Sequence, residues 1–571
     1  MAKFAPRTIQ AVAQELGLAD EDIELYGRGK AKIELAAIGR PPTGKGRLIL
    51  VTAINPTPAG EGKTTTSIGL AMGMRRLGKN AVLALREPSL GPVFGVKGGG
   101  TGGGKASLVP ADDINLHFTG DIHAITTAHN LLSALVDNAI YFRDRFDGGS
   151  AANAAGRSTP EASELDSRQI TWGRALDMND RFLRNVIVGL GGKSHGTPRE
   201  DRFDITAASE IMAVLALSKD YADLEERLSR IVVGSSFDGK AVTAGQVGAA
   251  SAMTAVLRDA LKPNLVQTAE GGPAIVHCGP FGNIAHGCNS VLATQLAMQL
   301  GDYAITEGGF GFDLGGEKFL NIKCRTMGVW PRAVVLVATL RALKMHGGAP
   351  VKSAGEPDRA KLEKGLAHLE KHLENAAVYG LTPVVAINVF PNDTPEELAL
   401  VREAAAKFGA RVAPCEGFAR GGEGAMELAQ TVIDVVDATD ANPPKAKYVY
   451  ELADAPEEKI RKLAKTIYGA RDVAFTPQAE KDLKRAKDLG YASLPICMAK
   501  TQLSLSDDPT VPGRPRDFLV TVREVRLSAG AGFLVPLTGE MMTMPGLPKV
   551  PAARGVKLLP NGKIKGLMQN D

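Results

Sequence analysis

The sequence predicts an α/β protein built on a doubly wound, mainly parallel sheet. Short apolar runs rich in β-branched residues recur along the chain, beginning with 48–54 and 81–85. Alanine- and leucine-rich stretches of helical period separate these runs, and a glycine-rich turn joins the first run to the helix that follows it. Strand, turn, helix and strand in this order form a βαβ unit, which requires parallel strands.

Each element follows from a local pattern. Buried strands are expected at 48–54, 81–85, 185–188, 274–277, 333–338 and 383–389. A helix is expected from Asp358 to about Glu374, because leucines at 362, 366, 369 and 373 form one stripe, and the Tyr379 to Pro383 segment closes it. The glycine-rich stretch 91–105 is expected to be neither helix nor strand, and to act as a closing flap over phosphates or as a flexible surface connection.

Length and composition limit the class of protein. A chain of 571 residues exceeds the size of one core, so two or three domains are expected. The net charge of +4 comes from 67 basic and 63 acidic residues without a long basic run, so nucleic acid is an unexpected partner. Five cysteines without a Cys-x-x-Cys pair indicate a reducing cytoplasm. The sequence has no signal core and no apolar stretch as long as a membrane span, so no membrane partner is expected.

The most informative segment is the turn after the first strand. It consists of Thr57, Pro58, Ala59, Gly60, Glu61, Gly62, Lys63 and Thr64. Such a turn directs backbone N–H groups and a helix N-terminus at phosphate, so it predicts a bound nucleoside triphosphate, ATP or GTP. Lys63 would reach the outer phosphates, and the Thr64 hydroxyl would bind magnesium. Thr57 stands where the usual pattern has its first glycine.

Three further charged residues are candidate catalytic groups. Arg86 and Glu87 follow the second strand, at the sheet edge where parallel sheets place ligands. Arg86 could grip a carboxylate or a phosphoryl group, although the two residues could equally form a structural ion pair. Asp121 lies in a mostly apolar segment, where it could hold magnesium, orient a substrate amine or cap a helix.

The histidine and cysteine patterns favour structural roles over metal binding or catalysis. His368 and His372 lie four residues apart, as metal ligands can, but the neighbouring Lys364 and Lys371 favour a solvated helix face. His117, His123 and His129 recur every six residues, which scatters them around a helix. Cys278 and Cys288 are expected to be core thiols.

Seven segments together resemble the formate–tetrahydrofolate ligases, also called formyltetrahydrofolate synthetases, over nearly the whole chain. These segments are 57–66, 86–95, 113–121, 282–287, 317–319, 341–348 and 494–502. The phosphate loop of that family looks like this one, threonine at position 57 included. The resemblance implies that ATP, formate and tetrahydrofolate are converted to ADP, phosphate and 10-formyltetrahydrofolate through formyl phosphate.

The resemblance also implies roles for particular residues. Lys63 and magnesium would neutralise the transferring phosphoryl group, and Arg86 would hold formyl phosphate. Phe390 and Phe418 match the two aromatic residues between which the family stacks the pterin, the second of which is commonly tryptophan in relatives. The smaller ring of Phe418 would weaken stacking somewhat. A homotetramer and activation by potassium or ammonium are implied as well.

The expected organisation has three parts. Residues 1–360 would form the large P-loop nucleotide-binding domain, with 147–164 as a surface insertion. Residues 361–480 would form a second α/β domain that contributes the folate site, and 481–571 a small C-terminal domain, α/β or α+β.

Two rival functions share the phosphate loop. Another P-loop ligase could form a different acyl phosphate, and the motif by itself does not separate the two. A P-loop ATPase switch of the partition or nitrogenase-reductase type would carry a second lysine five residues before Lys63, where this chain has Pro58.

Overall fold

A computed structural model describes residues 5–58, 60–96, 100–146, 164–539 and 541–567. The predicted insertion therefore lies outside the described residues except for Glu164, and Ala59 of the phosphate loop also lies outside them. Among the described residues, no helix is both long enough and apolar enough to cross a bilayer.

The centre of the molecule is a twelve-stranded mixed sheet. Its main path runs β1 (Ile23–Leu25), β2 (Ala31–Ile33), β14 (Asn264–Thr268), β15 (Pro273–Val276), β4 (Ala81–Leu85), β16 (Tyr303–Glu307), β3 (Arg47–Ala53), β17 (Ala333–Ala338), β18 (Pro383–Asn388) and β19 (Arg411–Cys415). All neighbours from β15 to β19 pair in parallel. The pairs of β14 with β15, β2 and β6 (Ala106–Val109) are antiparallel, and β5 (Gly102–Gly103) pairs with β6. The prediction of an α/β protein with a mainly parallel sheet is confirmed.

Helices cover both faces of this sheet. Along β3, Ile49 and Val51 pack into the core under α2 (Lys63–Arg76) and α15 (Met426–Asp437). Leu48 and Leu50 point into the opposite core, under α9 (Val291–Leu300), α11 (Leu340–His346) and α12 (Arg359–Val378). Successive side chains of a strand alternate between faces, so a fully buried strand needs an apolar run rather than an alternating pattern.

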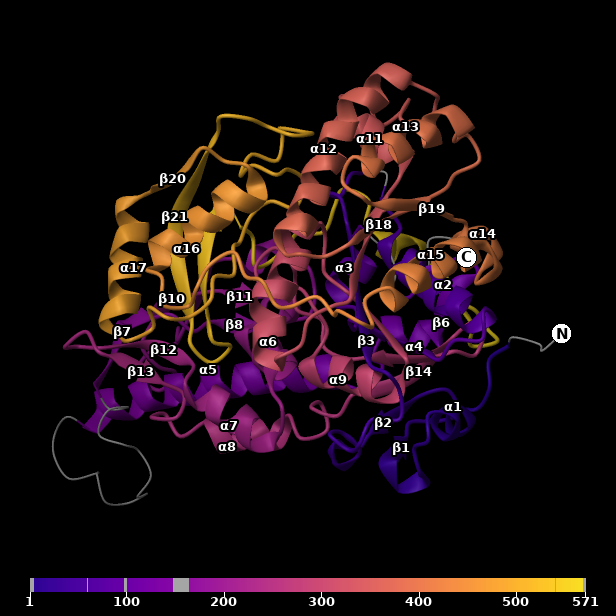
Figure 1. The fold of residues 1–571 in the computed structure, drawn as a ribbon. Helices are drawn as coiled ribbons and strands as arrows, with labels where there is room; N and C mark the ends of the chain where they lie inside the picture. Colours follow the sequence, from indigo (N-terminus) through magenta and orange to yellow (C-terminus); the bar gives the residue numbers. More distant parts are fainter. Residues whose placement is uncertain (1–4, 59, 97–99, 147–163, 540, 568–571) are drawn as a thin grey trace.

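Two further groups of elements flank the sheet (Figure 1). One contains α5 (Asp121–Phe146) and the three-stranded sheet of β7 (Leu165–Ile170), β12 (Val232–Ser236) and β13 (Ala241–Thr243). The other contains β20 (Asp472–Phe475), β21 (Leu519–Ser528) and β22 (Phe533–Thr538), with α16 (Pro456–Leu463) and α17 (Pro477–Asp488). In Figure 1 this second group stands at the upper left, in orange and yellow.

The remaining elements are short. The helices are α1 (Ile9–Glu15), α3 (Leu90–Phe94), α4 (Ala111–Asn115), α6 (Glu210–Leu217), α7 (Tyr221–Ser229), α8 (Ala250–Val256), α10 (Cys324–Met327), α13 (Pro395–Ala406) and α14 (Gly417–Arg420). The strands are β8 (Arg174–Ala175), β9 (Val186–Val188), β10 (Arg199–Asp201), β11 (Phe203–Asp204), β23 (Lys557–Leu558) and β24 (Ile564–Lys565).

Five of the six predicted strands occur in the central sheet, and one does not. The run 185–188 contains β9, which among the described strands pairs only with β10 and leaves Ile187 62% exposed. The prediction of a buried strand there is wrong, because three apolar residues between polar and glycine neighbours suffice for a surface hairpin. The prediction that 91–105 is neither helix nor strand is also wrong, because its described residues include most of α3 and the strand β5, which pairs with β6.

Helix α12 confirms the prediction at 358–374 and extends to Val378. Asp358 caps it by accepting from the Lys361 N–H at 3.0 Å, and Gly380 adopts a positive φ just after its end. The prediction of a solvated face for His368 and His372 is wrong, because both are fully buried. The helix packs on the core below the sheet through its leucine stripe, while His368 contacts the Gly513 carbonyl and His372 contacts Asn55.

The predicted domain boundaries stay predictions. The sheet continues across residue 360, because β18 and β19 pair in parallel with each other and through β17 with β3. The C-terminal sheet begins before residue 481, since β20 pairs with β21.

Candidate active site

The predicted phosphate loop lies between β3 and α2. Gly60 and Gly62 have φ angles of +72° and +71°, which only glycine adopts readily. The N–H of Thr57 donates to the Glu61 carboxylate at 2.7 Å, and the Thr57 hydroxyl donates to the same oxygen at 3.1 Å. The threonine that departs from the usual pattern therefore closes the loop upon itself through Glu61.

A carboxylate from the neighbouring strand meets the first turn of α2. The Thr64 hydroxyl donates to Glu307 Oε2 at 3.2 Å, and Glu307 is the last residue of β16. The other carboxylate oxygen, Glu307 Oε1, is buried and has no hydrogen-bond partner among the residues that the structure describes. A buried anionic oxygen of this kind is stable only beside a cation or a donor, so Thr64 and Glu307 fit a magnesium ion that also binds phosphate oxygens.

Lys63 and Arg86 approach the same backbone segment. Lys63 Nζ donates to the Phe310 carbonyl at 3.1 Å. Arg86 donates from Nη1 to the Pro280 carbonyl at 3.2 Å, and the same Nη1 lies 3.0 Å from the position that a Cβ of Gly309 would occupy. Two cations, one at the start of α2 and one directly after β4, thus flank residues 309–310, at the carboxyl edge of the parallel sheet.

Glu87 and Asp121 are both buried, and the charge of Asp121 acts on Glu87. Glu87 is 4% exposed, and within the described part of the chain its Oε2 has no hydrogen-bond partner, while its N–H donates to the Cys278 carbonyl at 2.8 Å. Burial, reinforced by the negative charge of Asp121, raises the pKa of Glu87 well above its ordinary value. Asp121 begins α5 and pairs with Lys32 Nζ at 2.7 Å.

The two predicted folate residues lie at the same edge of the sheet. Phe390 follows β18 and Phe418 lies in α14, which follows β19, and these strands are parallel neighbours. Phe418 is 45% exposed, so its ring is available to a ligand. The Arg341 guanidinium lies 3.9 Å from the centroid of the Phe390 ring and covers one of its faces.

The glycine-rich segment 91–105 contacts α14 at Phe418. The Lys105 N–H donates to the Phe418 carbonyl at 2.9 Å. A Cβ on Gly104 would lie 2.2 Å from that carbonyl oxygen, so only glycine allows the approach. Lys97 of the predicted flap lies outside the described residues.

The sequence did not single out two residues of this site. Glu307 ends an Ala-Ile-Thr-Glu run followed by two glycines, and an acidic residue at the end of a strand was the available signal. Asn388 ends β18, and its Nδ2 donates to the Glu61 carbonyl at 3.3 Å. This contact joins the predicted folate side to the phosphate loop, and no spacing in the sequence reveals it.

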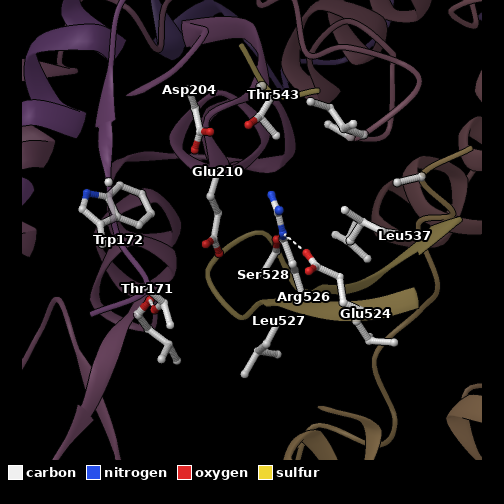
Figure 2. Close-up of a pocket in the computed structure, with 18 of the residues that line it drawn as sticks. Thr171, Trp172, Asp204, Glu210, Glu524, Arg526, Leu527, Ser528, Leu537 and Thr543 are labelled. Carbon is white, nitrogen blue, oxygen red and sulfur yellow. Dashed lines mark hydrogen bonds and ion pairs between the residues drawn. The ribbon is translucent and has the colours of Figure 1, made fainter. Parts of the chain in front are cut away.

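A separate cavity of about 470 Å³ lies between α6 and β21 (Figure 2). Glu210 lines it, with Oε1 accepting from the N–H groups of Gly530 at 2.8 Å and Ala531 at 3.2 Å. Burial raises the pKa of Glu210 to about 7. Among the described residues that line this cavity, none belongs to the predicted ATP or folate site.

In the described part of the chain, no three His, Cys, Asp or Glu residues gather as a metal site would need. All five cysteines are buried and unpaired, including the predicted core thiols Cys278 and Cys288.

Comparison with known proteins identifies the family of the chain. The family model described as formate–tetrahydrofolate ligase matches residues 1–568. A formate–tetrahydrofolate ligase from Myxococcus xanthus (strain DK1622) is 60% identical over 565 residues, which cover 99% of this chain and 100% of the relative. The chain is therefore an ATP-dependent enzyme of one-carbon metabolism that ligates formate to tetrahydrofolate. It belongs to the formate–tetrahydrofolate ligase family.

Proposed function

We propose that the loop from Thr57 to Thr64 is a P-loop that binds ATP, and that the γ-phosphate of this ATP is transferred to formate. The observation that carries this proposal is the approach of Lys63 and Arg86 to one backbone segment, residues 309–310. Lys63 comes from the loop that would hold the triphosphate, and Arg86 offers a guanidinium to a small carboxylate. Their positions would bring the phosphoryl donor and the acceptor together.

The first step forms formyl phosphate. An oxygen of formate attacks the γ-phosphorus, and the bond from that phosphorus to the bridging oxygen of ADP breaks. Charge accumulates on the phosphoryl oxygens, so positioned cations supply most of the catalysis in such transfers. Lys63 and Arg86 would stabilise that charge, and magnesium, when bound at Thr64 and Glu307, neutralises the phosphates.

The second step transfers the formyl group. The N10 lone pair of tetrahydrofolate attacks the formyl carbon, the bond from carbon to the phosphate oxygen breaks, and the departing phosphate accepts the N10 proton. Placement of the amine is the main requirement. We assign the pterin to the exposed ring of Phe418 and to Phe390, whose other face is covered by Arg341.

A monovalent cation is part of the proposal. The Glu87 carboxylate is buried, has an oxygen without a partner and lies in the field of Asp121. A carboxylate in this setting needs either a proton or a cation. We therefore place potassium or ammonium near Glu87, where the ion would replace the proton, and not at Asp121, because Lys32 already pairs with Asp121. The activity of the enzyme in potassium, ammonium and tetramethylammonium salts at one ionic strength tests this assignment.

We extend the proposal to the assembly and the compartment. A homotetramer is expected, and sedimentation equilibrium measures it directly. Five unpaired buried cysteines support a reducing cytoplasm.

Dependence of ATP cleavage on formate tests the reaction sequence. ADP formation is expected only when formate is present, and hydroxylamine in place of tetrahydrofolate should trap formohydroxamate slowly. ADP formation at the same rate without formate would exclude a formyl phosphate route. Replacing formate by acetate should abolish ADP formation. ADP formation that is faster with acetate than with formate would favour a ligase that forms another acyl phosphate.

A further inference from the structure

A buried polar cluster surrounds Asn55, the residue at which β3 turns into the phosphate loop. The Asn55 N–H donates to His368 Nε2 at 3.4 Å, and the Asn55 carbonyl accepts from His346 Nε2 at 2.9 Å. His372 Nε2 lies 3.1 Å from Asn55 Oδ1. All four residues are buried, with exposed fractions of 5% or less. The cluster therefore holds both the backbone and the side chain of Asn55.

The same two histidines hold the backbone of Gly513. His346 Nδ1 accepts from the Gly513 N–H at 3.3 Å, and His368 Nδ1 donates to the Gly513 carbonyl at 2.8 Å. A neutral imidazole has one donor and one acceptor, so these contacts fix both tautomers. His346 is protonated on Nε2 and His368 on Nδ1. Each ring thus bridges one backbone group of Asn55 to one backbone group of Gly513.

The bridge is compact and leaves little freedom. The rings of His346 and His368 are stacked, with centroids 3.7 Å apart and planes inclined by 20°. Gly513 has a φ of +72°, and a Cβ there would lie 2.7 Å from the His346 carbonyl oxygen. Only glycine allows the segment around residue 513 to approach this closely.

The cluster also contacts Asp313, in the segment that follows the Lys63 contact at Phe310. Asn55 Nδ2 donates to Asp313 Oδ1 at 3.1 Å, and Lys500 Nζ pairs with Asp313 Oδ2 at 3.0 Å. Asp313 lies three residues after Phe310, whose carbonyl accepts from Lys63. The turn before the phosphate loop and the segment opposite Lys63 therefore share one set of buried contacts.

We propose that His346 and His368 are positioning residues for ATP, which fix the start of the phosphate loop by bridging Asn55 to Gly513. This inference rests on the proposed role of Thr57 to Thr64 as a P-loop. The two rings contribute no atom to the reaction, and they act through Asn55. ATP binding therefore depends more on the hydrogen bonds from the two rings to Asn55 than on their hydrogen bonds to Gly513.

A matched pair of variants separates the two halves. In His346→Gln the side-chain amide reaches the position of Nε2 and can still donate to the Asn55 carbonyl. In His346→Asn the shorter amide reaches only the position of Nδ1 and can accept only from Gly513. Both variants lose the stacked ring and one hydrogen bond, so their thermal stabilities should be similar.

Steady-state kinetics of the full-length enzyme provide the test. His346→Asn should raise the KM for MgATP about five- to tenfold and leave the KM for tetrahydrofolate unchanged, whereas His346→Gln should stay within about twofold of the unaltered enzyme. Equal effects of both variants on ATP, or parallel increases of the ATP and folate KM values, would overturn the inference. The proposed function is tested separately, by measuring on the unaltered enzyme whether ADP formation depends on formate. Its failure can therefore be told apart from failure of this inference.

A second pair guards against variants that do not fold. His368→Gln can keep an acceptor facing the Asn55 N–H, and His368→Asn cannot. The same split in ATP affinity is expected, measured by calorimetric titration with MgADP. An equal Kd for MgADP in this pair would also overturn the inference.

Discussion

Gly62 is the position at which the proposed phosphate loop can be perturbed most selectively. Its φ is +71°, and a Cβ there would lie 2.3 Å from Asn388 Nδ2. In Gly62→Ala the left-handed backbone costs about 1–2 kcal/mol. Asn388 must also move, which breaks its bond to the Glu61 carbonyl and costs about 1 kcal/mol more. The expected destabilisation is therefore about 2–3 kcal/mol.

Gly78 provides the matched control at the other end of α2. Its φ is +75°, but nothing lies within 4 Å of the Cβ that alanine would add. Gly78→Ala should therefore lose only the backbone contribution, about 1–2 kcal/mol. Urea unfolding of both variants measures this difference, and a second substitution, Asn388→Ala, should recover part of the loss in Gly62→Ala.

The binding of MgATP separates loop geometry from stability. At a concentration of about 100 times Kd, a ligand stabilises the folded state by about 2.7 kcal/mol. If Gly62→Ala weakens binding tenfold, that stabilisation falls to about 1.4 kcal/mol, whereas Gly78→Ala should keep it. Thermal melts with and without MgATP give both values. Equal stabilisation of the two variants by MgATP would refute the assignment of Gly62 to the phosphate site.

Three further predictions concern other parts of the molecule. Glu307→Gln removes the anionic partner of Thr64, so the magnesium concentration needed for half-maximal activity should rise about 10- to 100-fold, and an unchanged magnesium titration would count against the site. Phe418→Ala should raise the KM for tetrahydrofolate about three- to tenfold with little change in the KM for ATP. Phe182→Ala, which removes a ring that is 86% exposed, serves as the control. Equal losses of folate and ATP affinity in Phe418→Ala would remove Phe418 from the pterin site. The pKa of Glu210 is raised to about 7, so the folded state favours the protonated carboxyl, and the stability this group contributes is present at acidic pH and declines as the pH rises through 7. The melting temperature of Glu210→Gln relative to the unaltered protein should therefore increase between pH 5 and pH 8, and a constant difference would contradict the raised pKa.

The sequence was sufficient wherever the signal was local. The run that becomes β3, the glycines at 60 and 62 and the helix beginning at Lys63 specify a strand, a left-handed turn and a helix within a few residues of one another. The stripe of leucines and the cap at Asp358 likewise specified α12. Patterns failed where the deciding partner was distant: the lysines beside His368 suggested solvent, but the sheet and the segment around Gly513 bury that face.

The sequence by itself determined the class of fold, the glycine-containing turn between β3 and α2 and, through whole-chain similarity, the family and its reaction. The tertiary structure decided which residues meet. Glu307 faces Thr64, Arg86 and Lys63 flank residues 309–310, and His346 and His368 bridge residues 55 and 513. The physical reason is that hydrogen bonds and charges act over a few ångströms, whereas these partners are separated by hundreds of residues along the chain. The parallel sheet gathers the carboxyl ends of its strands at one edge and so brings Thr64, Arg86 and Glu307 within that range, and the packing of α11, α12 and the segment around residue 513 adds the two histidines.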